Sequence, residues 1–182
     1  MPTLTTSAAG PKAGGSLIWG ISTDVTHIAP FGAVATANQH GKEPIYDSLV
    51  AWDKDLNVVP ALAESWENPD EKTWIWHLRK GVKFHDGTEM TAKDVVASMK
   101  LQVDPPPPGV KNNYLGKFES AEAIDDYTVQ FKTTAVDPGL LGYLAWSRYS
   151  PIIPEGMYDR INAQAAGIGT GPFKLVEYVA ND

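Results

Sequence analysis

The sequence predicts a mixed α+β fold, within the α/β class, in which two β-hairpins flank an amphipathic helix. Trp74, Trp76 and Leu78 are spaced by two, which puts three large apolar side chains on one face of a strand. Apolar residues then recur at helical spacing between residues 92 and 103, and strand-like alternation returns between residues 118 and 133. With 43% hydrophobic residues, the chain of 182 residues has enough apolar side chains for a packed core.

The amino-terminal part is predicted to contain little regular structure. Residues 1–16 are small, Thr, Pro and Gly residues without periodicity, which indicates a flexible tether and lacks the basic and apolar regions of a signal peptide. We expect a strand at 17–22, where apolar residues alternate, and a long loop at 23–41 with a short helix at 33–38. Residues 44–52 are expected to form a short helix that leads into a short strand.

Two hairpins are predicted from alternation and turn residues. Residues 63–67 are expected to pair with the tryptophan-rich strand across a turn at 68–72, whose Pro and Asp suit tight-turn geometry. The second hairpin spans 118–133 and turns at Asp125-Asp126. Its inner face carries the alternating apolar residues, so both hairpins should share one core.

A helix is predicted between the hairpins. We expect the Thr91 hydroxyl to accept a hydrogen bond from an early N–H, while Asp94 lies in the positive first turn. The apolar stripe of this helix should pack on the first hairpin. The helix is expected to end near Val103, because the prolines at 105–108 lack the N–H that would continue it.

The carboxyl-terminal third is predicted to alternate helices and strands. Asp137-Pro138 is typical of a helix start, with Asp as N-cap and Pro at the first helical position, and this helix is expected to reach Trp146. A strand at 149–153, a helix at 155–163 and a final strand at 173–179 should follow.

Composition excludes several classes of function. Lys and Arg number 15 against 22 Asp and Glu, so the net charge of −7 argues against a nucleic-acid partner, which needs a basic surface. The chain has no cysteine, so disulfides, thiolate metal sites and cysteine nucleophiles are excluded. No run approaches the ~20 apolar residues of a membrane-spanning helix.

No motif predicts catalysis, a metal or a cofactor. The glycines of 167–171 are followed by Pro172 and a strand-like run, not by the helix that a phosphate-binding loop requires, so we interpret them as a crossover. His85-Asp86 precedes a glycine at a tight turn and is interpreted as part of that turn. His27 and His40 lack metal-ligand spacing, and no serine has the glycines of a nucleophile elbow.

Four segments carry a resemblance to a known family. They are PALAESW at 60–66, LRKGVKFHDGTEMTAKD at 78–94, the Asp125-Asp126 hairpin and GTGPF at 169–173. In this order and spacing the chain resembles the amino-terminal part of extracytoplasmic solute-binding protein family 5, the peptide and nickel binding components of ABC importers. The resemblance implies a fold like the type II periplasmic binding proteins, here a partial first lobe plus an accessory subdomain.

The resemblance also implies a domain organisation. Residues 1–16 would be the tether, 17–46 the first part of the ligand-binding lobe, 47–170 the accessory subdomain with its connections, and 171–182 a return strand of that lobe. Family members continue into a second lobe, so the chain is expected to be an amino-terminal fragment. Because half of a cleft provides about half of its contacts, the fragment should bind solute more weakly than the full chain. A truncated lobe also leaves apolar surface and strand edges uncovered, which favours self-association.

The function implied by the resemblance is solute binding for an ABC importer, without catalysis or cofactor. The expected partners are a small solute, with an oligopeptide as the first choice, and a membrane permease. The expected location is periplasmic or extracellular, with a membrane tether; Met1 fits a natural start as well as a secreted protein without its signal or lipidated cysteine. Two alternatives stay open, a surface sensor or interaction protein that keeps the fold without transport, and a hydrolase built on this scaffold.

Six residues are candidates for solute contact. They are Arg148, Trp146, Tyr149, Tyr114, Gln39 and Val34. In some family members an arginine at the place of Arg148 faces the ligand, and a guanidinium suits a carboxylate through two parallel hydrogen bonds. A salt bridge inside the lobe is the alternative for Arg148, and core packing is the alternative for the aromatic residues.

Overall fold

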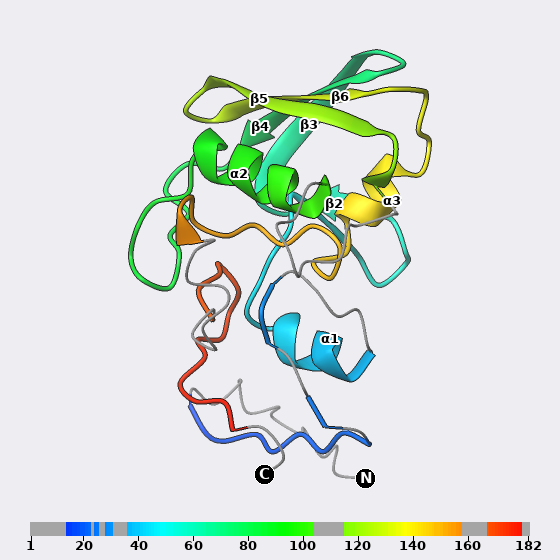
Figure 1. Ribbon diagram of the computed structural model, residues 1–182. Helices are drawn as coiled ribbons and strands as arrows, with labels where there is room; N and C mark the ends of the chain where they lie inside the picture. The colour runs from blue at the N-terminus through cyan, green and yellow to red at the C-terminus, as the bar shows by residue number, and fades with distance from the viewer. Residues whose placement is uncertain are drawn as a thin grey trace, which may run out of the picture.

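The computed structural model describes residues 14–22, 24–25, 28–30, 36–103, 115–157 and 167–179. Its helices and strands (Figure 1) are, in chain order, α1 (Thr36–Lys42), β1 (Val50–Trp52), β2 (Val58–Pro60), β3 (Ala63–Asp70), β4 (Thr73–Leu78), α2 (Ala92–Val103), β5 (Phe118–Asp125), β6 (Thr128–Thr133) and α3 (Leu140–Leu144). The strands form a two-stranded sheet, β1-β2, and an antiparallel four-stranded sheet in the order β3-β4-β6-β5. The mixed α+β prediction is confirmed.

One helix covers the four-stranded sheet. α2 lies across one face and packs against β5 and β6 (Figure 1). Trp76, Met99 and Phe131 are fully buried between them, and the Trp76 and Phe131 rings lie 5.6 Å apart. Burying a side chain of this size contributes roughly 1.5–3 kcal/mol, so this cluster holds α2 on the four-stranded sheet. The predicted core position of Trp76 is therefore confirmed.

The first hairpin differs from its prediction at the turn. The predicted pairing of the two strands is confirmed, but the turn is shorter than the predicted 68–72, because β3 continues to Asp70 and the chain reverses at Glu71-Lys72. The Asp70 carboxylate accepts the Lys72 N–H at 2.8 Å and thereby closes a tighter turn. β3 is an edge strand, so it tolerates Pro69, which cannot donate to a ladder.

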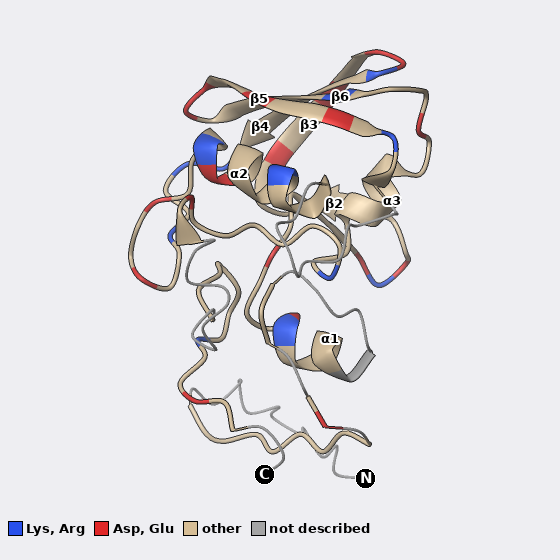
Figure 2. Ribbon diagram, in the orientation of Figure 1, with Lys and Arg blue, Asp and Glu red and all other residues tan. Residues whose placement is uncertain are grey.

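Acidic residues lie at the tips of both hairpins (Figure 2). Both tips use the same hydrogen bond, in which an aspartate carboxylate accepts the backbone N–H of the residue two positions later. At the second tip the Tyr127 N–H donates to Asp125 at 2.8 Å. These hydrogen bonds lower the pKa of the Asp70 and Asp125 carboxyls, first through the backbone N–H groups of Lys72 and Tyr127. The turn predicted near Asp125-Asp126 is confirmed.

The start of α2 uses a different hydrogen bond from the one predicted. The Thr91 hydroxyl is a donor and not the predicted acceptor; the Thr91 N–H and hydroxyl both donate to Asp94 Oδ2, at 2.7 and 3.0 Å. Asp94 Oδ1 accepts the Glu155 N–H at 2.7 Å, which ties the helix start to a distant segment. The helix ends at Val103 as predicted.

α3 is shorter than predicted. Its N-cap is Gly139, not Asp137, whose carboxylate instead accepts the Gly139 N–H at 3.2 Å. The helix ends at Leu144 and not at Trp146. The Ser150 hydroxyl donates to the Leu144 carbonyl at 3.0 Å, so the chain folds back on the helix end there.

Three predicted strands are absent from the described residues. Three segments lie outside any sheet: 17–22, 149–153 and 173–179. A strand needs a neighbour to form a hydrogen-bonded ladder, and none lies beside these segments among the described residues. They make isolated backbone hydrogen bonds instead; for example, the Ile152 N–H donates to the Asp47 carbonyl at 3.0 Å. In the outer two segments apolar side chains face solvent, and Leu17 and Val176 are 87% and 97% exposed.

The helices predicted in the amino-terminal part are also displaced. One helix, α1, ends at Lys42, and a turn at 43–45 replaces the helix expected to begin at Pro44. Pro44 suits a position beyond a helix end, because it cannot continue the backbone hydrogen bonding. The short strand that follows is confirmed as β1. Most of the helix predicted at 155–163 lies outside the described residues, as does most of the tether at 1–16.

Candidate functional site

A glycine loop, residues 167–171, lies against the segment before β1. Residues 167–171 pass so close to this segment that a Cβ on Gly169 would lie 2.2 Å from the Ile45 carbonyl oxygen, and one on Gly171 would lie 2.5 Å from the Pro44 oxygen. The Gly171 N–H donates to the Ile45 oxygen at 2.9 Å. Glycine is therefore required by close approach of two backbones, which fits the interpretation of the loop as a crossover.

His85 holds the same loop from the opposite side. Its Nε2 lies 2.8 Å from the Gly171 carbonyl oxygen, and its Nδ1 accepts the Gly169 N–H at 3.3 Å. Its Nδ1 also lies 3.2 Å from the Gly167 carbonyl oxygen, so the ring has three polar contacts with the loop. The neighbouring Asp86 carboxylate is engaged by the Thr88 N–H and hydroxyl, at 2.9 and 2.6 Å. Asp86 thus stabilises the turn, as predicted, while His85 binds the glycine loop, a contact that was not predicted.

Polar side chains are buried on α1. Gln39 and Lys42 are only 2% and 4% exposed, and their spacing of three places them on the same side of the helix. Neither amide atom of Gln39 has a hydrogen-bond partner among the described residues. Burial, and then the charge of Arg148, lower the pKa of the Lys42 ammonium to about 8.

Arg148 reaches this region from the segment that follows α3. Its guanidinium carbon lies 5.0 Å from the centre of the Tyr149 ring, in a cation–π arrangement. The Tyr149 ring in turn meets the Tyr143 ring edge to face at 6.5 Å. Trp146, at the start of this segment, is 42% exposed. The segment therefore presents a cation and aromatic surfaces together.

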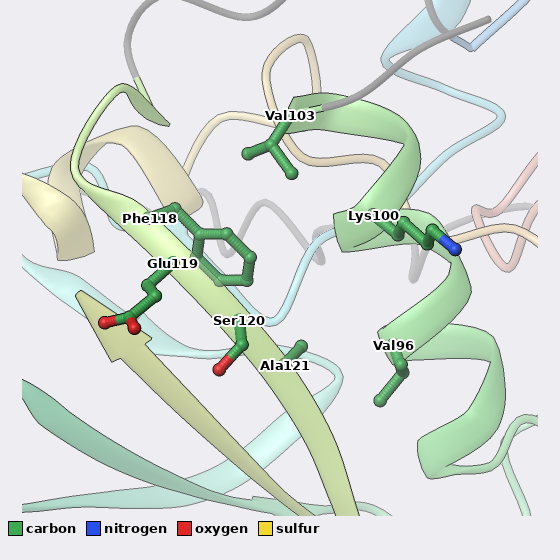
Figure 3. A pocket seen from close by; sticks show the side chains of 7 residues that line it. All are labelled: Val96, Lys100, Val103, Phe118, Glu119, Ser120 and Ala121. Carbon is green, nitrogen blue, oxygen red and sulfur yellow. The ribbon is translucent and has the colours of Figure 1, made fainter. Parts of the chain in front are cut away.

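A separate hollow of about 240 Å³ lies between α2 and β5 (Figure 3). It is lined by Val96, Lys100, Val103, Phe118, Glu119, Ser120 and Ala121. The Phe118 ring points toward α2 and forms its apolar wall. None of the predicted solute-contact residues lines it, so the hollow is distinct from the polar region on α1.

Within the described residues, no group of three or more His, Cys, Asp or Glu side chains could hold a metal ion. No helix in the described part of the chain is long and apolar enough to cross a membrane.

Comparison with known proteins decides the family. Residues 57–182 match the family described as bacterial extracellular solute-binding proteins, family 5 Middle. The chain belongs to this family. The resemblance noted in the sequence, and a fold shared with periplasmic binding proteins, are thus confirmed.

Three similar proteins illustrate the family 5 relationship. The periplasmic oligopeptide-binding protein OppA of Escherichia coli is 28% identical over 188 residues, covering 92% of this chain and 34% of OppA. The solved structure of AppA from Bacillus subtilis, in complex with a nonapeptide, is 28% identical with a TM-score of 0.77, covering 87% and 33% of the two chains. AgaA from A. tumefaciens, in complex with agropinic acid, is 31% identical with a TM-score of 0.78, covering 86% and 32%.

This family 5 chain spans about a third of the length of the curated relatives it matches. All three proteins above carry names or descriptions of binding proteins, not of enzymes. The position of the match is the amino-terminal portion of these proteins, which agrees with a partial lobe.

Two of the predicted solute-contact residues are linked through Lys42. Gln39 lies one turn from Lys42 on α1, and the charge of Arg148 contributes to the lowered pKa of Lys42. Trp146 and Tyr149 flank Arg148 in sequence, while Tyr114 and Val34 lie outside the described residues. Whether any of them contacts solute stays a prediction.

Sequence reasoning missed Lys42. Lysine is rarely buried, so its residue type favoured an exposed position. Its spacing of three from Gln39 was the signal available in the sequence, but that spacing identifies a common helix side and gives no information about burial.

Proposed function

We propose that this chain is part of the solute-binding component of an ABC importer, and that the whole protein captures an oligopeptide or a related small solute in a cleft between two lobes. The observation that carries the proposal is the family 5 match over residues 57–182. The relatives named for oligopeptide binding, and the complexes with a nonapeptide and with agropinic acid, support it.

The polar region on α1 is the proposed solute-facing side of the lobe. Arg148 and Gln39 supply hydrogen-bond donors there, and the partly exposed Trp146 and Tyr149 supply apolar surface. A few placed polar groups beside aromatic side chains are typical of small-molecule sites. Tyr114 and Val34 are proposed to belong to the same site.

Transport would follow from closure around the solute. A solute that touches both lobes favours the closed state only by the difference between its affinities for the closed and open forms. The remaining chemistry of import would belong to the membrane permease, which is the proposed protein partner. The proposed location is periplasmic or extracellular, with the whole protein tethered to the membrane.

A ligand screen with the full-length protein tests this function. Thermal unfolding is measured with di- to nonapeptides, sugar–amino acid conjugates, metal chelates and simple organic acids. A solute at 100 times its Kd stabilises the folded state by about 2.7 kcal/mol, a rise in Tm of roughly 2–4 °C for a protein about three times as long as this chain. Deletion of the gene should abolish uptake of the radiolabelled solute. If no compound raises Tm and uptake is unchanged, the proposal is wrong.

A further inference from the structure

The half-buried His85 ring faces three backbone groups of the glycine loop. Its Nε2 lies 2.8 Å from the Gly171 carbonyl oxygen, its Nδ1 lies 3.2 Å from the Gly167 carbonyl oxygen, and the Gly169 N–H donates to the same Nδ1 at 3.3 Å. Two of these groups are acceptors and one is a donor. A neutral imidazole has one N–H and one lone pair, and an imidazolium ion has two N–H groups. No protonation state of the ring can therefore satisfy all three groups.

The charge of the ring decides which contact is lost. The 2.8 Å contact of Nε2 requires a proton on that nitrogen in both charge states, because two bare acceptors repel each other at this distance. In the neutral ring the lone pair on Nδ1 then accepts the Gly169 N–H, and the Gly167 carbonyl receives no hydrogen bond from the ring. In the imidazolium ion Nδ1 donates to the Gly167 carbonyl, and the Gly169 N–H loses its acceptor.

We propose that His85 makes the glycine loop responsive to pH, because protonation of the ring exchanges the Gly169 N–H for the Gly167 carbonyl. Histidine is the side chain that ordinarily changes its charge between pH 5 and 8. The His85 N–H donates to the Gly169 carbonyl at 2.9 Å, and the Lys174 ammonium donates to the His85 carbonyl at 2.8 Å. Neither bond uses the ring, so the loop stays attached and the change is confined to the Gly169 amide.

The change is transmitted to the chain at the end of α1. Gly169 has no free space, since a Cβ there would lie 2.2 Å from the Ile45 carbonyl oxygen and 2.8 Å from Tyr46 Cδ1. Tyr46 is itself only 1% exposed. A rotation of the Gly169 peptide therefore displaces Ile45 and Tyr46, because a packed interior does not absorb such a movement. This inference goes beyond the proposed function and does not depend on it.

The elements around the ring carry five charged residues. They are Lys174 after the loop, Asp47 before β1, and Lys83, Asp86 and Glu89 in the turn that contains His85. The Asp47 carboxylate accepts the Thr170 hydroxyl at 2.9 Å. In the part of the chain that the structure describes, the ring's hydrogen bonds all go to backbone groups and none goes to a charged side chain. Its protonation is thus linked to the loop backbone and not to an ion pair.

Nuclear magnetic resonance of the full-length protein tests the exchange at the Gly169 amide. Labelling isoleucine carbonyls with carbon-13 and glycine nitrogens with nitrogen-15 selects this amide, because Ile168-Gly169 is the only Ile-Gly pair in the sequence of this chain. If the rest of the protein adds such pairs, Ile168→Val removes the Gly169 signal and so identifies it. Exchange of the amide with solvent, divided by the intrinsic rate at each pH, gives its protection, and the His85 ring signal gives the charge of the ring.

We expect the protection of Gly169 to be about fivefold lower at pH 5 than at pH 8, the factor that corresponds to one hydrogen bond of about 1 kcal/mol. The loss should follow the His85 ring signal with the same midpoint. His85→Gln should remove the pH dependence. His77→Gln is the matched control, since His77 lies on β4 and its ring contacts Glu67 at 3.2 Å, and it should leave the pH dependence unchanged.

Three results would overturn the inference. They are a Gly169 protection that stays constant while the ring gains its proton, a ring that keeps one charge state from pH 5 to pH 8, and a pH dependence that persists in His85→Gln. If His85→Gln does not fold, the titrations of the wild type and of His77→Gln decide by the first two criteria.

Discussion

Adding one methyl group at Gly169 should damage the joint between the glycine loop and the segment before β1. The Cβ of Gly169→Ala would lie 2.2 Å from the Ile45 carbonyl oxygen and 3.0 Å from its carbonyl carbon, both backbone atoms, and 2.8 Å from Tyr46 Cδ1. To restore ordinary contact, the Ile45 carbonyl would have to move by roughly 1 Å. That carbonyl accepts the Gly171 N–H at 2.9 Å, so the movement also weakens a hydrogen bond.

The expected loss follows from these two effects. Overpacking costs typically about 1–3 kcal/mol and a hydrogen bond about 1 kcal/mol, so Gly169→Ala should lower the free energy of unfolding by about 2–4 kcal/mol. For a chain of this size that corresponds to a fall in Tm of roughly 5–15 °C. Differential scanning calorimetry at neutral pH measures it.

A second glycine provides the control. Gly142 lies in α3, and a Cβ there would meet the Trp52 ring at 3.5 Å, an ordinary van der Waals contact. Gly142→Ala should therefore stabilise the protein by about 0.5–1 kcal/mol, because alanine favours a helix more than glycine does. A Gly169→Ala variant that melts within 2 °C of the wild type would refute the steric reasoning.

Two further predictions concern buried charged groups. The pKa of Lys42 falls from 10.5 in the unfolded chain to about 8 in the folded one, so the folded state binds fewer protons between these values and the free energy of unfolding should rise with pH from about 8 to 10.5. Lys42→Met should remove this rise and stabilise the protein by up to about 3 kcal/mol at pH 7, at about 1.4 kcal/mol per pKa unit. Urea titrations of the wild type and the variant at pH 7 and pH 10 measure the free energy of unfolding. An equal change of that free energy with pH in the two proteins would contradict the prediction. Asp94→Ala deprives the Thr91 and Glu155 N–H groups of their acceptor and should cost about 3 kcal/mol in the same assay. Asp94→Asn keeps one acceptor oxygen and should cost less, and an equal loss in the two variants would show that hydrogen bonding is not the cause.

The sequence predicts the elements whose evidence is local. The alternation of Trp74, Trp76 and Leu78 and the stripe of α2 place apolar side chains on one side of a single element. The structure buries Trp76 and Leu78 there and packs the partly buried Trp74 against the same core. The turn residues gave a less accurate prediction of where β3 ends. The Asn68 amide donates to the Asp70 and Thr73 carbonyls, and these hydrogen bonds extend the strand into the range where the turn was expected.

Strands and charges that depend on distant partners were not predictable. Residues 17–22 and 173–179 have the alternation of strands, but alternation does not say whether another strand lies beside them. Lys42 has no sequence signal for burial, and its environment is made by Arg148 from another part of the chain. The candidate site was therefore only partly foreseen, through Gln39 and Arg148.

The distribution of indole rings determines what emission spectroscopy can report. Trp66, Trp74 and Trp76 stack against one another inside the subdomain, with ring centres 5.8 and 6.1 Å apart between neighbours. Their fluorescence will follow melting of the sheet and will change little when a small molecule enters the polar region on α1. Trp146 is two residues from Arg148 and half open to water. It can report on that region together with Trp19, which is 60% exposed and whose ring lies 5.4 Å from that of His40 on α1. Both signals have to be read above the background of the three sheet tryptophans.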